Sequence, residues 1–229
     1  MGLAKRLAAI ASYVPVGSVA ADIGTDHAYL PVFLVEEGIC ARVIATDIKQ
    51  GPYASALRRI EEAKLTGKID LRLGNGLDVL QPGEADVLVL SGMGGNTIRE
   101  ILTAAPHVTE TVRRLVLQPM ADPGDLRTWL AANGWRISDE SLVEDGGKIY
   151  IVIMAEPGRE ETRDPFLLEL GPRLLEKKDP LLGRYAERIA GLYEQVLAGL
   201  ECANSDAARE KALEIKTKLS QFRGIAGCL

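Results

Sequence analysis

Short runs rich in β-branched residues alternate with helical patterns from Val19 to Ala155. This alternation is typical of βαβ units built around a mainly parallel sheet. Strands are expected at Val19–Ile23, Arg42–Asp47, Asp70–Leu73, Ala85–Ser91, Arg113–Gln118, Arg136–Val143 and Lys148–Ala155. Helices are expected at Leu3–Tyr13, Asp26–Glu37, Pro52–Leu65, Asn96–Ala104 and Asp122–Asn133. The pattern therefore predicts an α/β fold with a Rossmann-like, seven-stranded sheet.

The last two expected strands are separated only by Glu144 to Gly147, with no helix between them. A connection this short joins antiparallel neighbours, whereas a parallel crossover needs a dozen or more residues. We expect these two strands to form an antiparallel hairpin at the edge of the sheet.

After Pro157 the chain becomes charged and poor in strand patterns. Apolar residues recur there at helical spacing, at Leu182, Tyr185, Ile189, Leu192, Val196 and Leu200, and then at Ala208, Ala212, Ile215, Leu219 and Phe222. The break at Asn204 to Asp206 offers Ser205 or Asp206 as an N-cap. We expect a catalytic domain over 1–158 and a coiled-coil-like helical hairpin over 159–229. The hairpin packs on the domain, forms a homodimer or contacts the substrate, and the pattern does not choose between these.

The composition excludes several classes of protein. The longest apolar run, Ile149–Ala155, is far below the roughly 20 residues that cross a bilayer. Ser12, Pro15 and Gly17 interrupt the N-terminal apolar stretch before it resembles a signal peptide. The three cysteines have no spacing that suggests a disulfide framework or a metal site, so we expect a cytoplasmic protein without metal or membrane.

The formal charge of −5 gives no bulk attraction to nucleic acid. Local basic groups are nevertheless present, at Arg58, Arg59, Lys64 and Lys68, and at Arg173, Lys177, Lys178, Arg184 and Arg188. Such groups are either solvated helix surface or a phosphate-binding face.

The loop after the first strand, Asp22-Ile23-Gly24-Thr25-Asp26-His27-Ala28, lies where parallel sheets bind ligands. It holds one glycine of a dinucleotide-binding pattern, and Asp26 places negative charge where a pyrophosphate would sit. A cationic or zwitterionic ligand fits better. S-adenosylmethionine carries a sulfonium and an ammonium group, so we expect Asp22, Gly24, Thr25, Asp26 and His27 to bind this cofactor. A structural role for His27 is the alternative.

The next two strand ends also carry polar groups. Asp47 follows the glycine loop by about 20 residues, the spacing at which a carboxylate accepts hydrogen bonds from ribose hydroxyls. Asn75 and Gly76 follow the third strand, where an amide would contact adenine. The alternative for Asp47 is a helix N-cap.

The fourth strand ends in Ser91-Gly92-Met93-Gly94-Gly95-Asn96. The glycines leave room for a flat base to approach a methyl group, although a turn with positive φ would also explain them. We expect Ser91 to contact the cofactor and Gly92, Met93 and Gly94 to shape the reacting centre.

These motifs carry a family resemblance. The stretches Ala21-Asp22-Ile23-Gly24-Thr25-Asp26-His27-Ala28-Tyr29-Leu30-Pro31, Ser91-Gly92-Met93-Gly94-Gly95, Leu117-Gln118-Pro119-Met120 and Glu144-Asp145-Gly146-Gly147-Lys148-Ile149-Tyr150 resemble the bacterial TrmK family, the tRNA (adenine(22)-N1)-methyltransferases. The resemblance covers nearly the whole chain, including Gly171-Pro172 and the helical tail. It implies an enzyme with a class I S-adenosylmethionine methyltransferase fold. The implied substrate is the D-arm region of tRNA.

The implied reaction is attack of adenine N1 on the sulfonium methyl group, which needs no strong general base. Asp26 is the candidate carboxylate that favours the adenine as it becomes cationic. Tyr29 and Met93 are candidate platforms for a base turned out of the RNA, and Gln118 a candidate substrate contact, with packing and strand termination as the alternatives. Two rival functions are a methyltransferase of small molecules or proteins and a noncatalytic module that binds cofactor and RNA. A nicotinamide oxidoreductase is opposed by the missing glycines and Asp26.

Overall fold

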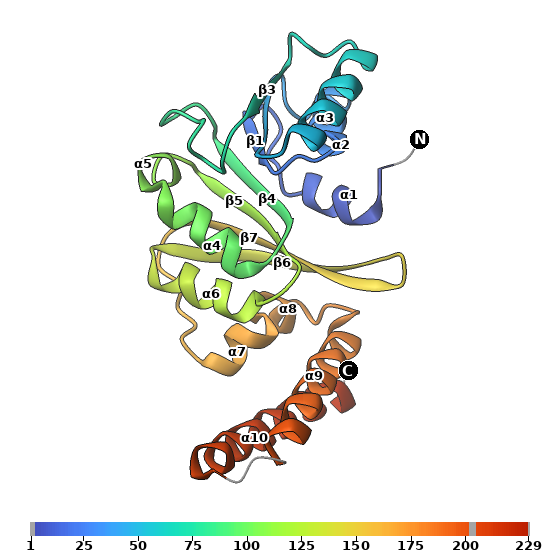
Figure 1. Ribbon diagram of the computed structural model, residues 1–229. Coiled ribbons are helices and arrows are strands. Elements are labelled where there is room, and N and C mark those ends of the chain that lie inside the picture. Colours follow the sequence, from blue (N-terminus) through green and yellow to red (C-terminus); the bar gives the residue numbers. More distant parts are fainter. Residues whose placement is uncertain (1–2, 202–204, 229) are drawn as a thin grey trace. The chain divides into compact units, whose positions relative to one another are not determined.

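The computed structural model describes residues 3–201 and 205–228 (Figure 1). The strands are β1 (Ala20–Ile23), β2 (Val43–Asp47), β3 (Ile69–Leu73), β4 (Val87–Met93), β5 (Arg114–Pro119), β6 (Trp135–Asp145) and β7 (Lys148–Pro157). The helices are α1 (Lys5–Ala11), α2 (Tyr29–Glu36), α3 (Gln50–Glu62), α4 (Gly95–Ala104), α5 (Pro106–Thr109), α6 (Pro123–Ala132), α7 (Pro165–Leu170), α8 (Pro172–Lys177), α9 (Leu182–Glu201) and α10 (Asp206–Cys228). Cys202 and the start of the expected break at Asn204 lie outside the described residues.

The strands form a seven-stranded sheet in the order β3-β2-β1-β4-β5-β7-β6. The five strands β1 to β5 pair in parallel, whereas β7 runs antiparallel to both β5 and β6. Gly146 and Gly147 make the hairpin turn with φ values of 56° and 74°, which suit the tight turn between twisted strands. The expected α/β fold and its antiparallel edge hairpin are confirmed.

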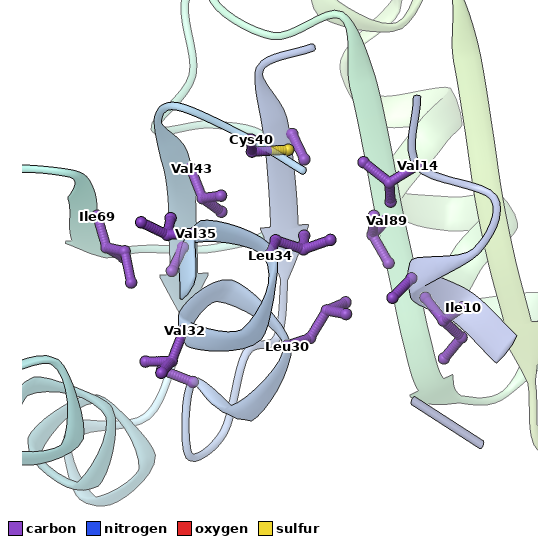
Figure 2. Packing of buried hydrophobic residues seen from close by; sticks show 14 of the residues in the cluster. Ile10, Val14, Leu30, Val32, Leu34, Val35, Cys40, Val43, Ile69 and Val89 are labelled. Atoms are coloured by element: carbon purple, nitrogen blue, oxygen red, sulfur yellow. The ribbon is translucent and has the colours of Figure 1, made fainter. Parts of the chain in front are cut away.

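An apolar layer packs α1, α2 and α3 against one face of the sheet, and Figure 2 shows part of it. Leu34 of α2 and Ile10 of α1 are fully buried there, together with Val43 and Val89 from β2 and β4. Burial of each aliphatic side chain of this size contributes about 1.5–3 kcal/mol. The layer holds α1 and α2 next to the end of β1, and α4 and α6 cover the opposite face (Figure 1).

Some element boundaries differ from the sequence prediction. Helix α2 begins at Tyr29 and not at Asp26, because Asp26 and Ala28 have positive φ values of 54° and 53°, which no α-helix contains. The short helices α5, α7 and α8 were not expected. Each begins at a proline, and proline at the first helical position is the signal that could have revealed them.

The chain divides into two compact units, the first ending at Glu169 and the second beginning at Leu170. Residues 159–169 therefore group with the sheet, whereas the sequence pattern placed them with the helical part. A buried arginine holds this segment. Arg127 pairs with Glu140 at 2.7 Å, both side chains being fully buried, and also donates to the carbonyl oxygens of Leu168 and Glu169 at 2.8 and 2.9 Å.

In the second unit, α9 and α10 pack together, with the rings of Tyr193 and Phe222 stacked at 5.8 Å. The apolar positions expected along α10 are buried. Along α9, by contrast, Leu192 and Val196 are 57% and 51% exposed. The helix turns Tyr193 towards α10 in their place. Within the described residues, no helix is long and apolar enough to cross a membrane.

Candidate functional site

The loop between β1 and α2 is held in an unusual backbone conformation. Gly24, Asp26 and Ala28 all have positive φ, which for the two non-glycine residues costs on the order of 1–3 kcal/mol each. The amides of Gly24 and Thr25 both donate to the carbonyl oxygen of Thr46 at 2.9 Å. The loop is thus tied to the end of β2, and strain of this kind is common at ligand sites.

Asp47 supplies a second tie. Its Oδ2 accepts the amide N–H of Asp26 at 3.1 Å, and its Oδ1 accepts the amide N–H of Lys49 at 2.9 Å. Asp47 is 7% exposed, and the two hydrogen bonds of its carboxylate hold both loops in place. Each oxygen keeps a second lone pair, so the structural role leaves the predicted ribose contact open.

A cavity of about 400 Å³ lies at the carboxyl ends of β1 and β4. Expected site residues that line it are Asp22, Gly24, Thr25, Asp26, His27, Tyr29, Ser91 and Gly92. Residues for which no role in the site was expected also line it, namely Arg6, Leu7, Leu30, Met120 and Tyr150. Two strand ends that are far apart in sequence therefore meet at one cavity.

Acidic groups dominate one wall of the cavity. Asp22 is 3% exposed, and burial raises the pKa of its carboxyl group from 3.8 to about 6, with the charge of Asp47 adding to the effect and Thr25 opposing it. The Asp26 side chain is 67% exposed, and its Oδ1 lies 3.6 Å from Nε2 of His27. A positively charged ligand would favour the ionised form of the Asp22 carboxyl group.

The end of β4 forms the other wall. Gly92 has φ of 76°, and a Cβ there would lie 3.4 Å from Nη1 of Arg6. A Cβ on Gly95 would lie 2.5 Å from the carbonyl oxygen of Asp122, so only glycine fits. The Met93 side chain packs on Gly24, its Cε 3.1 Å from where a Cβ would stand, and Gly94 is the N-cap of α4. These glycines allow the chain to pass close to its neighbours.

Gln118 lies behind the cavity and does not line it. Its side chain is fully buried, and Oε1 accepts hydrogen bonds from Arg6 Nη1 at 2.7 Å and from the Gly92 amide at 3.2 Å. Its Nε2 donates to the Pro119 carbonyl oxygen at 3.1 Å. The amide thus orients Arg6 and Gly92, and a direct substrate contact stays a prediction.

Asn75 and Gly76 stay outside the cavity as well. They follow β3, which is separated from β1 by β2, and Asn75 is exposed. They could contact only an adenosine that extends from the cavity past Asp47. Their role in binding adenine stays a prediction.

An exposed aromatic cluster stands at the rim. The Tyr29 ring lies 5.8 Å from that of His27, and the guanidinium of Arg59 lies 3.8 Å from the centre of the Tyr29 ring. Tyr29 is 48% exposed, so one part of the ring is held by Arg59 while another remains accessible. This arrangement can receive a nucleobase by stacking.

The sequence offered no local signal for Arg6 as a site residue, and Tyr150 stood in a family motif without an expected role in the site. Arg6 comes from α1, and Tyr150 comes from β7 at the far end of the first unit. They meet only because the sheet order brings β7 beside β5 and α1 packs close by. Such proximity follows from tertiary structure and not from spacing along the chain.

The cavity fits S-adenosylmethionine on chemical grounds. Acidic side chains that would attract a cation line it, Arg6 supplies a positive charge, and the glycine loop allows close approach of the backbone. Among residues 3–201 and 205–228, no group of three or more His, Cys, Asp and Glu side chains is placed to hold a metal ion.

Comparison with known proteins agrees with this chemistry. Residues 3–153 match a family model described as a methyltransferase domain. The tRNA (adenine(22)-N(1))-methyltransferase of Bacillus subtilis is 34% identical over 97% of this chain and 96% of its own length.

Two solved structures show the same architecture. A Streptococcus pneumoniae protein, in complex with S-adenosyl-L-methionine, superposes with a TM-score of 0.88 at 32% identity, over 98% of this chain and 100% of its own. TrmK of M. capricolum, in complex with S-adenosyl-homocysteine, gives 0.82 at 27% identity over 98% of each chain. The chain belongs to the tRNA (adenine(22)-N(1))-methyltransferase family.

Proposed function

We propose that this protein transfers the methyl group of S-adenosylmethionine to N1 of adenine 22 in tRNA. The observation that carries the proposal is the cavity where the strained, acidic loop after β1 meets the glycine-rich end of β4. Membership of the methyltransferase family supports the same reaction.

When bound, S-adenosylmethionine supplies an electrophilic methyl group that adenine N1 attacks in line. The Asp26 carboxylate at the rim favours positive charge as it develops on the adenine ring. Backbone of Gly92, Met93 and Gly94 leaves space for the base. Because N1 is a pairing-edge atom, the base must leave its stack, and the exposed face of Tyr29 receives it.

We assign the cofactor to the buried side of the same cavity. Asp22 and the loop of Gly24, Thr25 and His27 contact the amino-acid part, and Ser91 lies at the transfer position. Asp47 accepts hydrogen bonds from the ribose hydroxyl groups, and Asn75 and Gly76 contact adenine. This order follows the carboxyl ends of β1, β2 and β3 across the sheet.

We further propose that basic residues at the end of α8 and in α9 bind tRNA phosphates, for which Lys178, the C-cap of α8, and Arg188 in α9 are candidates. Phosphate contacts release counterions, so the affinity for tRNA should fall steeply as salt concentration rises. A salt titration of tRNA binding, repeated with Lys178→Ala, tests this. An unchanged salt slope in the variant argues against a contact at Lys178.

The deciding experiment measures methyl transfer from labelled cofactor to unmodified tRNA, followed by digestion and mass spectrometry. We expect 1-methyladenosine at position 22 with the wild type, and a large loss with Asp26→Ala. Asp125→Asn, which removes an exposed carboxylate from α6, is the matched control. Cofactor binding without methylation of any tRNA would contradict the proposal and favour a noncatalytic module that binds cofactor and RNA. Methylation of a small molecule or protein would favour a methyltransferase with that substrate.

The second unit has exposed apolar side chains, at Leu192, Val196 and Leu213. We propose that this cytoplasmic enzyme forms a homodimer and that these side chains lie in its interface. Sedimentation of the wild type and of Leu192→Glu tests the dimer. A monomer at all concentrations would contradict it.

A further inference from the structure

Arg6 is the one cationic side chain among the described residues that line the cavity, apart from the titratable His27. It is half-buried and fixed on several sides. Its backbone N–H donates to Oδ2 of Asp145 at 3.1 Å, its Nη1 donates to Oε1 of Gln118 at 2.7 Å, and its guanidinium lies 5.4 Å from the centre of the Tyr150 ring. A long flexible side chain is therefore held in one place before any ligand arrives.

The charge of this guanidinium is not neutralised by the protein. Within the part of the chain that the structure describes, no carboxylate oxygen lies within 4.0 Å of it, Asp145 meeting only the backbone N–H. A guanidinium has five N–H donors, and the hydrogen bond to Gln118 uses one of them. A preorganised, half-buried cation with unused donors is complementary to an oxyanion.

We propose that Arg6 binds the carboxylate of the methionine part of S-adenosylmethionine. The same cavity is lined by Asp22 and Asp26, which attract the ammonium group of the same amino-acid head. A ligand with both charges close together satisfies the arginine and the aspartates at once. An RNA phosphate carries only negative charge and would be repelled by the two aspartates.

Gln118 acts as a positioning residue in this arrangement. Its Oε1 joins Arg6 to the Gly92 amide, so the cation that holds the cofactor is coupled to the backbone of the transfer site. Lysine could not replace arginine at position 6 without loss. Its ammonium group is a single charged centre and lacks the planar fork of N–H donors with which a guanidinium reaches Gln118 and a carboxylate together.

The inference rests on the cofactor part of the proposed function, and its binding measurements need no tRNA. Calorimetry would compare the binding of S-adenosylhomocysteine with that of its decarboxylated analogue, which keeps the ammonium group. We expect Arg6→Met to weaken S-adenosylhomocysteine binding by about tenfold or more, the effect of a charged hydrogen bond, and the analogue by less than about twofold. Arg6→Lys should fall between wild type and Arg6→Met.

Lys5→Met is the matched control, because it removes one positive charge from the same helix at an exposed position outside the cavity. It should bind both ligands as the wild type does. Retained binding of the decarboxylated analogue by Arg6→Met shows that the variant is folded.

Equal losses for both ligands, or no loss for either, would overturn the proposal. Unchanged cofactor binding with a raised KM for tRNA would also overturn it, because the oxyanion would then be an RNA phosphate. A failure of methyl transfer to tRNA would leave the binding result intact, so the two proposals fail separately.

Discussion

Asp22 links the stability of the unliganded protein to pH. Burial raises its pKa from 3.8 to about 6, so the folded state disfavours the ionised carboxylate relative to the unfolded state. The folded state therefore binds a proton more tightly, and its stability is greatest below the unfolded pKa and decreases as pH rises through the folded pKa. At neutral pH the empty site carries this penalty, which a cationic ligand would relieve.

We expect Asp22→Asn to remove this pH dependence. In the wild type, the Asp22 contribution lowers the free energy of unfolding by on the order of 3 kcal/mol between about pH 4 and pH 7. Urea unfolding of both proteins across this range measures the difference, with Asp125→Asn as the control. Parallel curves for wild type and Asp22→Asn would show that Asp22 titrates normally.

Tyr29 offers a test of the base platform. Tyr29→Ala removes the stacking surface and should lower kcat/KM for tRNA by about 5- to 100-fold, whereas Tyr29→Phe keeps the ring and should lie near wild type. Steady-state kinetics with varied tRNA and saturating cofactor measure this. If the phenylalanine variant loses as much as the alanine variant, the hydroxyl group matters and stacking is not the explanation.

At the scale of elements, the close approach of α4 to the loop before α6 depends on one glycine. A Cβ at Gly95 would lie 2.5 and 2.8 Å from the carbonyl oxygens of Asp122 and Ala121, which are backbone atoms. We expect Gly95→Ala to lower the free energy of unfolding by about 1–3 kcal/mol and to displace the Gly92 to Gly94 segment.

Gly51 in the first turn of α3 is the matched control, because no atom beyond its chain neighbours and the nearby backbone of its own helix lies within 4 Å of its Cβ position. Gly51→Ala should be neutral or stabilise by up to about 1 kcal/mol. Urea unfolding of both variants makes the comparison. Equal stability of the two variants would contradict the steric argument.

The same scale shows what the sequence could predict. The seven strands and the polar residues that follow them were predictable, because short runs rich in β-branched residues and strand-end placement are local patterns. The start of α2 was not, because two non-glycine residues with positive φ lie in the loop. The contact between Arg6 and Gln118 joins residues 112 positions apart, and no local pattern encodes such a pair.

At the scale of the whole molecule, Arg127 defines where the first unit ends. Its buried guanidinium donates hydrogen bonds to the carbonyl oxygens of Leu168 and Glu169. The buried carboxylate of Glu160 accepts a hydrogen bond from the Ile137 amide N–H at 2.9 Å. The segment 159–169, which the sequence pattern placed with the helical part, therefore completes the polar interior of the sheet domain.

Two truncations should separate these boundaries. A chain that ends at residue 158 leaves the Arg127 guanidinium without two acceptors and should lose about 3–5 kcal/mol of stability relative to a chain that ends at Leu170. Thermal and urea unfolding of both fragments measure this. Equal stability would show that residues 159–169 are dispensable for the sheet domain.

The reach of Arg6 also has a consequence for protein synthesis. Its backbone and side chain contact residues 139 and 112 positions later, so α1 leaves the ribosome well before the strands that it contacts, which are nearly the last of its unit. A nascent chain that lacks the β6–β7 hairpin cannot close the cavity. We therefore expect cofactor to bind only completed molecules, and at about a hundredfold excess over Kd it would stabilise them by about 2.7 kcal/mol. Growing chains would gain none of that protection.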